Sequence, residues 1–245
     1  MNKLLLFTFL ISLSIFSQKE ITKNQDSFLV FQLFTSQGCS SCPPADYLLE
    51  QVKKETANKN VIVMSYHVDY WNRLGWVDPF SSREFTKLQY TYGKKFNSNS
   101  VYTPQLVING AEHFVGSNKT KIKQRLNKYD TFKSSNKIIL KNTKSKNNSI
   151  STSYEVLGST EGKSIVFALV LERKSTFVKR GENSNKSITN SNIVIKQISS
   201  SINNEDGNFD IEIPKDYLQE NNLRLIAFTQ KENLEITGAT QQILK

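Results

Sequence analysis

The sequence predicts an α/β domain followed by an all-β domain of the β-sandwich type. From 28 to 130, apolar runs alternate with amphipathic segments of helical period, which is typical of β-α-β organisation. From 137 to 245, helical periodicity is absent, and short β-branched runs alternate with clusters of Asn, Ser and Gly, which is typical of a sandwich. The polar segment between them, 131–136, is predicted to be a linker.

The first 17 residues are typical of a secretory signal peptide. Lys3 precedes an unbroken apolar stretch from Leu4 to Phe16, and the small residues Ser14 and Ser17 offer a cleavage region. This stretch is shorter than the roughly 20 apolar residues that span a bilayer, and no later segment of the sequence reaches that length. We therefore expect an exported protein, periplasmic or secreted, with no transmembrane segment after cleavage. An uncleaved N-terminal anchor is the alternative.

The first elements after this leader form a predicted β-α-β crossover. The run FLVFQLFT, 28–35, is continuously apolar or β-branched, which indicates a strand buried on both faces. In PPADYLLEQVKKE, 43–55, apolar residues recur at helical spacing, and the two prolines suit a first helical turn. A second buried run, NVIVMSYHVDYW, follows from position 60. Such crossovers between parallel strands are right-handed in nearly all cases.

The remaining elements follow from the same patterns. A helix is predicted from about Ser82 to Lys95, a hairpin around Asn109-Gly110 in VYTPQLVINGAEHFVG, and a last helix over 119–129. The order to residue 130 is thus β-α-β-α-β-β-α. Seven or so short strands are predicted beyond 137, with VKRGENSNKSITNSNIV forming an exposed hairpin or a long loop among them.

The basic residues are concentrated in one part of the chain. The formal net charge is +10, and the segment from Lys119 to Lys146 has many lysines with only Asp130 opposing them. Such a segment can contact an anionic surface, although a solvated lysine-rich face explains it as well. Arginines and aromatic residues do not alternate with the lysines, so we expect no nucleic-acid partner.

The two cysteines, Cys39 and Cys42, form the motif C-x-x-C between the first predicted strand and the first predicted helix. At a helix amino end, free backbone N–H groups and the helix dipole favour a thiolate, so Cys39 is the expected nucleophile. Cys42, one helical turn later, can attack a mixed disulfide formed at Cys39 and resolve it. The pair therefore predicts thiol–disulfide chemistry, with the Cys39–Cys42 disulfide as the redox group and no other cofactor.

The sequence resembles two protein groups. The C-x-x-C between parallel strands, followed later by Thr103-Pro104, resembles the thioredoxin-like superfamily over roughly 28–130. The stretches FTSQGCSSCPPAD, HVDYWNRLGWVDPF, YTPQLVING and RGEN are together similar to a family of exported bacterial proteins classified as a domain of unknown function. The superfamily resemblance implies an α/β thioredoxin-like domain, a cis Pro104 beside the cysteines, and Thr103 at the edge that docks a protein thiol or disulfide partner.

The sequence also departs from the thioredoxin pattern. Thioredoxins usually have a buried acid in the strand before the cysteines, but FQLFTSQG has none. His67 and Asp69 are the candidates for handling the proton, because they lie at the carboxyl end of the second parallel strand. Trp71 and Trp76 are expected beside the site, either packed over it or in contact with a substrate.

Two alternatives to the oxidoreductase prediction stay open. Cys39, Cys42 and His67 could bind Cu(I), and His113 is the only further histidine that could complete a zinc site. A redox-inactive binding module with a structural disulfide is the second alternative. The segment RGEN, 180–183, suggests no chemistry, and a salt-bridged turn between the two domains is its simplest interpretation.

Overall fold

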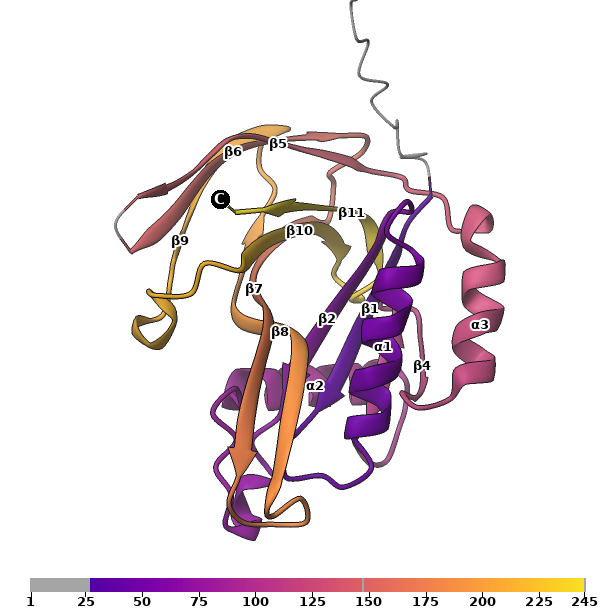
Figure 1. The fold of residues 1–245 in the computed structure, drawn as a ribbon. Helices are drawn as coiled ribbons and strands as arrows, with labels where there is room; N and C mark the ends of the chain where they lie inside the picture. Colours follow the sequence, from indigo (N-terminus) through magenta and orange to yellow (C-terminus); the bar gives the residue numbers. More distant parts are fainter. Residues whose placement is uncertain (1–26, 147, 245) are drawn as a thin grey trace, which may run out of the picture.

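The computed structural model describes residues 27–146 and 148–244. The predicted signal peptide lies outside the described residues. Within them the chain forms three α-helices and eleven strands (Figure 1). In chain order these are β1 (Leu29–Thr35), α1 (Pro43–Glu55), β2 (Val61–His67), α2 (Arg83–Lys95), β3 (Gln105–Ile108), β4 (Glu112–Val115), α3 (Lys119–Asn127), β5 (Lys137–Lys146), β6 (Ser149–Leu157), β7 (Lys163–Val178), β8 (Lys186–Ser201), β9 (Asp206–Glu212), β10 (Leu223–Lys231) and β11 (Ile236–Ile243).

Eight of the strands form one mixed sheet in the order β11-β10-β7-β8-β2-β1-β3-β4. β1 and β2 are parallel, and β3 pairs with β1 in the antiparallel direction. The strands β5, β6 and β9 form a separate three-stranded sheet, which lies across one end of the molecule in Figure 1. The element order up to α3 matches the predicted β-α-β-α-β-β-α.

The predicted fold class is wrong. The N-terminal segment does not form an α/β thioredoxin-like domain that a separate β-sandwich follows, because β7, β8, β10 and β11 join the same sheet as β1 to β4. The junction is a parallel contact between β2 and β8, with Ser65 opposite Ile193. Every residue of β2 is buried, so an unpaired edge there would leave buried backbone polar groups without partners. The chain is mostly β, with its two halves joined through one sheet.

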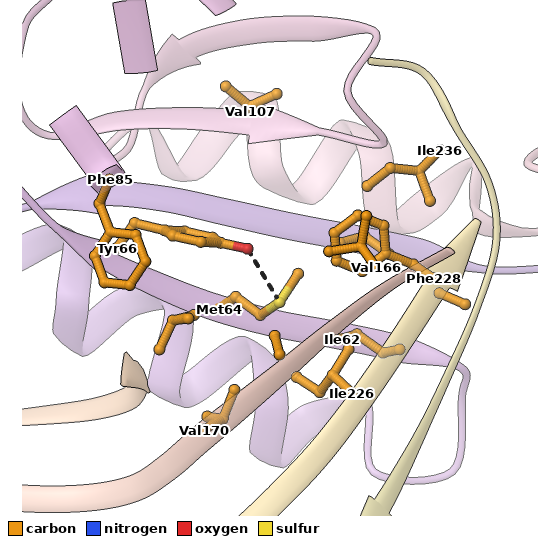
Figure 2. Packing of buried hydrophobic residues seen from close by; sticks show 14 of the residues in the cluster. Ile62, Met64, Tyr66, Phe85, Val107, Val166, Val170, Ile226, Phe228 and Ile236 are labelled. Atoms are coloured by element: carbon orange, nitrogen blue, oxygen red, sulfur yellow. Dashed lines mark hydrogen bonds between the residues drawn. The ribbon is translucent and has the colours of Figure 1, made fainter. Parts of the chain in front are cut away.

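The two halves also share a hydrophobic core. Figure 2 shows Met64 of β2, Val166 of β7 and Phe228 of β10 in one cluster, which also contains Phe85 of α2. A second cluster packs α1 and α3 against alternate residues of β1 and β2. A third cluster lies between the three-stranded sheet and β7 and β10. Because side chains alternate between the faces of a strand, β1 and β2 contribute to the first two clusters at once.

The hairpin formed by β7 and β8 is longer than the strands beside it. Each of the two strands has 16 residues, against 7 in β2. The turn of this hairpin therefore lies at the end of the molecule where β1 and β2 finish, beyond the edge of the sheet (Figure 1). The sequence predicted this segment as an exposed hairpin or long loop. The structure confirms the hairpin, but Asn183 in its turn is buried.

Candidate functional site

The C-x-x-C segment links the end of β1 to the start of α1. Cys42 is the N-cap residue of α1, and prolines occupy the first helical positions. Both cysteines are free thiols, and they are 1% and 0% exposed, whereas Ser40 and Ser41 between them face the solvent. Upstream, Gly38 allows a close approach, because an added Cβ there would lie 3.1 Å from Trp71 Cβ. The loop therefore holds the two thiols inward and the two serines outward.

Cys39 is surrounded by groups that favour its thiolate. Its Sγ lies 3.3 Å from Ser41 Oγ, and hydrogen bonds from the side chains of Ser41 and Thr103 both favour the thiolate. While protonated, the thiol donates to the carbonyl oxygen of Thr103 over 3.8 Å. A hydrogen bond with Cys42 has the largest effect, and with the other contacts it outweighs burial and lowers the pKa of Cys39 to about 6. At neutral pH this thiol is therefore mostly ionised, which is the state of a nucleophilic cysteine.

Cys42 has the opposite character. Burial raises the pKa of its thiol well above the ordinary value, and the negative charges of Cys39 and Asp46 add to the effect. A thiol with a low pKa next to one that keeps its proton is the asymmetry that stepwise thiol exchange requires. Before Cys42 can attack, however, its proton has to be accepted by another group.

Asp46 is the acid nearest to this thiol along the helix. It follows Cys42 by one helical turn, and its backbone N–H donates to the Cys42 carbonyl over 3.1 Å. Its carboxylate accepts a hydrogen bond from Thr35 Oγ1 over 2.8 Å, and only 6% of the residue is exposed. Burial raises the pKa of Asp46 to about 6, although the positive charge of His67 opposes the rise. A carboxyl that titrates near 6 can accept and release a proton close to neutral pH.

His67 ends β2 and pairs with the carboxylate of Asp78, which was not among the predicted site residues. Its Nδ1 lies 2.7 Å from Asp78 Oδ2, and both side chains are fully buried. Burial opposes a charge on the ring, but attraction and hydrogen bonding to Asp78 raise the pKa of His67 overall. The same attraction, with the amides of Gln37 and Phe80, lowers the pKa of Asp78 despite its burial. The pair is therefore held as an ion pair.

Two buried atoms in this group lack hydrogen-bond partners among the described residues. They are Nε2 of His67 and Oδ1 of Asp46. The charge of His67 acts on Asp46. These two side chains therefore form one electrostatically linked group with Asp78 next to Cys42.

The predicted pairing of His67 with Asp69 is not found. The Asp69 carboxylate instead accepts a hydrogen bond from Thr86 Oγ1 over 2.6 Å, at the start of α2. The sequence contains a signal for one of the two acids that are present. Asp46 is four residues after Cys42, which places both on one face of a helix. Asp78 precedes Pro79 in a loop, and nothing in the sequence indicated that this loop folds back to His67.

Thr103, Pro104 and the tryptophans lie around the cysteine loop. The Thr103–Pro104 peptide bond is cis, as the resemblance implied. Trp71 Nε1 donates to Thr103 Oγ1 over 2.8 Å, and Trp76 Nε1 donates to Gln37 Oε1 over 3.2 Å. Each indole is thus bonded to a segment of the site, and substrate contact by either ring stays a prediction.

The segment RGEN lies directly on the cysteine loop. Asn183 Nδ2 donates to the carbonyl oxygens of Gln37 and Cys39, over 3.0 Å and 2.9 Å. The Glu182 carboxylate accepts from the backbone N–H of Ser40 over 2.8 Å. The expected salt-bridged turn is therefore replaced by a set of side-chain contacts to the backbone around Cys39.

The described part of the chain contains no group of three or more His, Cys, Asp and Glu side chains that could hold a metal ion. His67 is directed to Asp78, and His113 lies beside Tyr102 and Phe96. The predicted copper ligands Cys39, Cys42 and His67 therefore do not form such a group among the described residues, and copper binding itself stays a prediction. Among the residues described, none of the helices has both the length and the apolar character that crossing a bilayer requires.

Comparisons with known proteins identify a family and match solved structures. Residues 30–230 match the family described as "Protein of unknown function (DUF1223)". A crystal structure of a protein from Agrobacterium tumefaciens, solved by structural genomics, has 27% identity and a TM-score of 0.66, and the match covers 90% of this chain and 96% of that one. OgpA from Akkermansia muciniphila has 13% identity and a TM-score of 0.25, covering 44% of this chain and 27% of that one. No curated protein matches.

Proposed function

The chain belongs to the DUF1223 family of proteins of unknown function, and we propose that it is a thiol–disulfide exchange protein. One observation supports this most strongly. Two buried thiols lie side by side with opposite pKa displacements, about 6 for Cys39 and well above the ordinary value for Cys42. The proposal depends on this site and not on membership of the thioredoxin-like superfamily.

The exchange proceeds in two steps that balance. The Cys39 thiolate attacks a sulfur of the partner disulfide, so one S–S bond breaks, a mixed disulfide forms, and one partner thiolate leaves. Cys42 then loses its proton and attacks Cys39 Sγ, which releases the second partner thiolate. The protein dithiol is oxidised by two electrons, and the partner disulfide is reduced to two thiols. Run in reverse, the same steps oxidise a partner dithiol.

Asp46 is the proposed acceptor of the Cys42 proton. It lies one helical turn from Cys42, and its pKa of about 6 allows it to be ionised at neutral pH. Thr35 orients the carboxylate, and the ion pair of His67 and Asp78 sets the local charge. Export through the predicted signal peptide would bring the dithiol into a compartment where protein disulfides persist.

Trapping with oxidised glutathione tests this function. The Cys42→Ser variant should accumulate a mixed disulfide at Cys39, because the resolving thiol is missing, and mass spectrometry detects the added glutathione. The Cys39→Ser variant is the matched control, and it should accumulate far less, since the Cys42 thiol keeps its proton. Equal labelling of the two variants, or none in either, would contradict the proposal.

A further inference from the structure

The turn between β7 and β8, residues 179–185, contacts the cysteine loop from far along the chain. We call it the hairpin tip. Asn183 and Cys39 are 144 positions apart, and Asn183 is 1% exposed where it bonds the Cys39 carbonyl. If the tip moves, the Gln37 carbonyl loses the hydrogen bond from Asn183, and the Cys39 carbonyl keeps only the backbone N–H of Cys42 at 3.3 Å. The buried amide therefore favours one position of the tip.

The contacts of the hairpin tip hold both sides of Cys39. The carbonyls of Gln37 and Cys39 accept from Asn183, and the N–H of Ser40 donates to Glu182. The Cys39 carbonyl and the Ser40 N–H belong to the peptide group after Cys39, and the Gln37 carbonyl belongs to the peptide group before Gly38. The tip therefore holds the backbone on both sides of Cys39, in the conformation in which Sγ points inward. In that conformation Sγ contacts the Thr103 carbonyl, and the residue is 1% exposed.

The tip is also supported by the loop that follows β2. At Gly181, an added Cβ would lie 3.6 Å from Trp76 Cβ, and Trp76 itself donates a hydrogen bond to Gln37. Gln37 in turn donates through Nε2 to Asn190 of β8 over 2.8 Å. The cysteine loop, the loop after β2 that contains Trp76, and the hairpin of β7 and β8 are thus linked through Gln37 by hydrogen bonds.

We propose that Glu182 and Asn183 form a latch that keeps Cys39 turned inward and thereby selects the partners that reach it. With the latch in place, small thiols and disulfides react, because they need only a small opening of the loop. A protein disulfide has to displace the hairpin tip before its sulfur reaches Cys39 Sγ. The latch concerns access to the thiol and rests on the proposed function only for its biological purpose.

Alkylation of reduced protein with reagents of two sizes tests the latch. Iodoacetamide is the small reagent, a maleimide on a long polyethylene glycol chain is the large one, and peptide mass spectrometry confirms reaction at Cys39. The quantity compared is the ratio of the large-reagent rate to the small-reagent rate. This ratio does not depend on the fraction of Cys39 that is thiolate, so a change of pKa in a variant does not affect it.

Three variants are compared with the natural protein. In both Asn183→Ala and Glu182→Ala the ratio should rise roughly 10- to 100-fold. Asn183→Ala removes two buried hydrogen bonds that oppose opening of the cysteine loop, and Glu182→Ala removes one charge-assisted hydrogen bond. Ser184→Ala is the matched control, because this exposed side chain belongs to the same turn, and its ratio should stay unchanged. Thermal unfolding confirms that each variant is folded, and Glu182→Ala, at an exposed position, decides the question if Asn183→Ala does not fold.

An unchanged ratio in a folded Glu182→Ala variant would overturn the latch. An equal rise in Ser184→Ala would overturn it as well, because the effect would then reflect general loosening of the turn. The test separates the latch from the proposed function. If the ratio rises as expected while no variant exchanges with oxidised glutathione, the latch stands and the exchange function fails.

Discussion

Replacing Asp46 by Asn should stabilise the protein at alkaline pH and impair its thiol chemistry. The carboxyl group is buried, and burial raises its pKa from 3.8 to about 6. The folded state therefore binds more protons than the unfolded chain between these values. The contribution of the Asp46 carboxyl to the free energy of unfolding is therefore fully present below pH 3.8, where the group is protonated. This contribution is lost as the pH rises through about 6.

The size of the effect follows from the two pKa values. The rise from 3.8 to about 6 corresponds to roughly 3 kcal/mol of lost stability at pH 8. In Asp46→Asn the charge is removed, while the side-chain oxygen can still accept the hydrogen bond from Thr35. We expect the free energy of unfolding to increase by up to about 3 kcal/mol at pH 8 and to change little at pH 4.

Urea unfolding of the reduced protein at both pH values measures this difference. Glu50→Gln on the same helix is the matched control, because a hydrogen bond from Lys54 lowers the pKa of Glu50, and this substitution should not stabilise the protein at pH 8. The Asp46→Asn variant should also keep its mixed disulfide with glutathione at least about tenfold longer, since Cys42 loses its proton acceptor. A variant that is less stable at pH 8, or resolves as fast as the natural protein, would refute the reasoning.

Three further predictions concern the thiol, the ion pair and the junction of the two halves. Cys42→Ala should raise the pKa of Cys39 above about 6, because the hydrogen bond with Cys42 contributes most to lowering that pKa. A pH titration of the ultraviolet absorbance of the thiolate measures the pKa, and a titration midpoint equal to that of the natural protein would contradict the prediction. His67→Gln should cost about 3–5 kcal/mol in urea unfolding by leaving Asp78 buried without its partner, and adding Asp78→Asn should recover most of the loss. In the natural protein this contribution should fall as pH drops through the lowered pKa of Asp78 or rises through the raised pKa of His67. Gly110→Ala should destabilise the fold, because the φ of Gly110 is +64° and the new Cβ would lie 1.9 Å from the backbone oxygen of Leu234 in the C-terminal half. A melting temperature equal to that of the natural protein would contradict this prediction.

Local elements were predictable because their patterns are local. The buried run of β1, the prolines at the start of α1 and the Asn109-Gly110 turn each indicate one structure within a few residues. The pairing of β8 with β2 left no such pattern. β8 is recognisable as a strand, but nothing in its residues specifies which edge it joins, and a single register pair links the two strands.

The site was predictable to the same extent. Cys39 and Cys42 follow from their spacing, and His67 follows from its place at the end of a buried strand. Asp46 could have been found from its helical spacing to Cys42, because it lies one turn further along the same helix. Asp78 and Asn183 could not, since they reach the site through loops whose course depends on the tertiary structure.

The reduction potential of the Cys39–Cys42 pair tests the central claim most directly. Equilibration of the protein with glutathione buffers of graded composition, followed by acid quenching and thiol counting, measures it. Exchange chemistry predicts a value of roughly −120 to −270 mV, the span of known oxidoreductases. A value well below about −300 mV, typical of structural disulfides, would contradict the account.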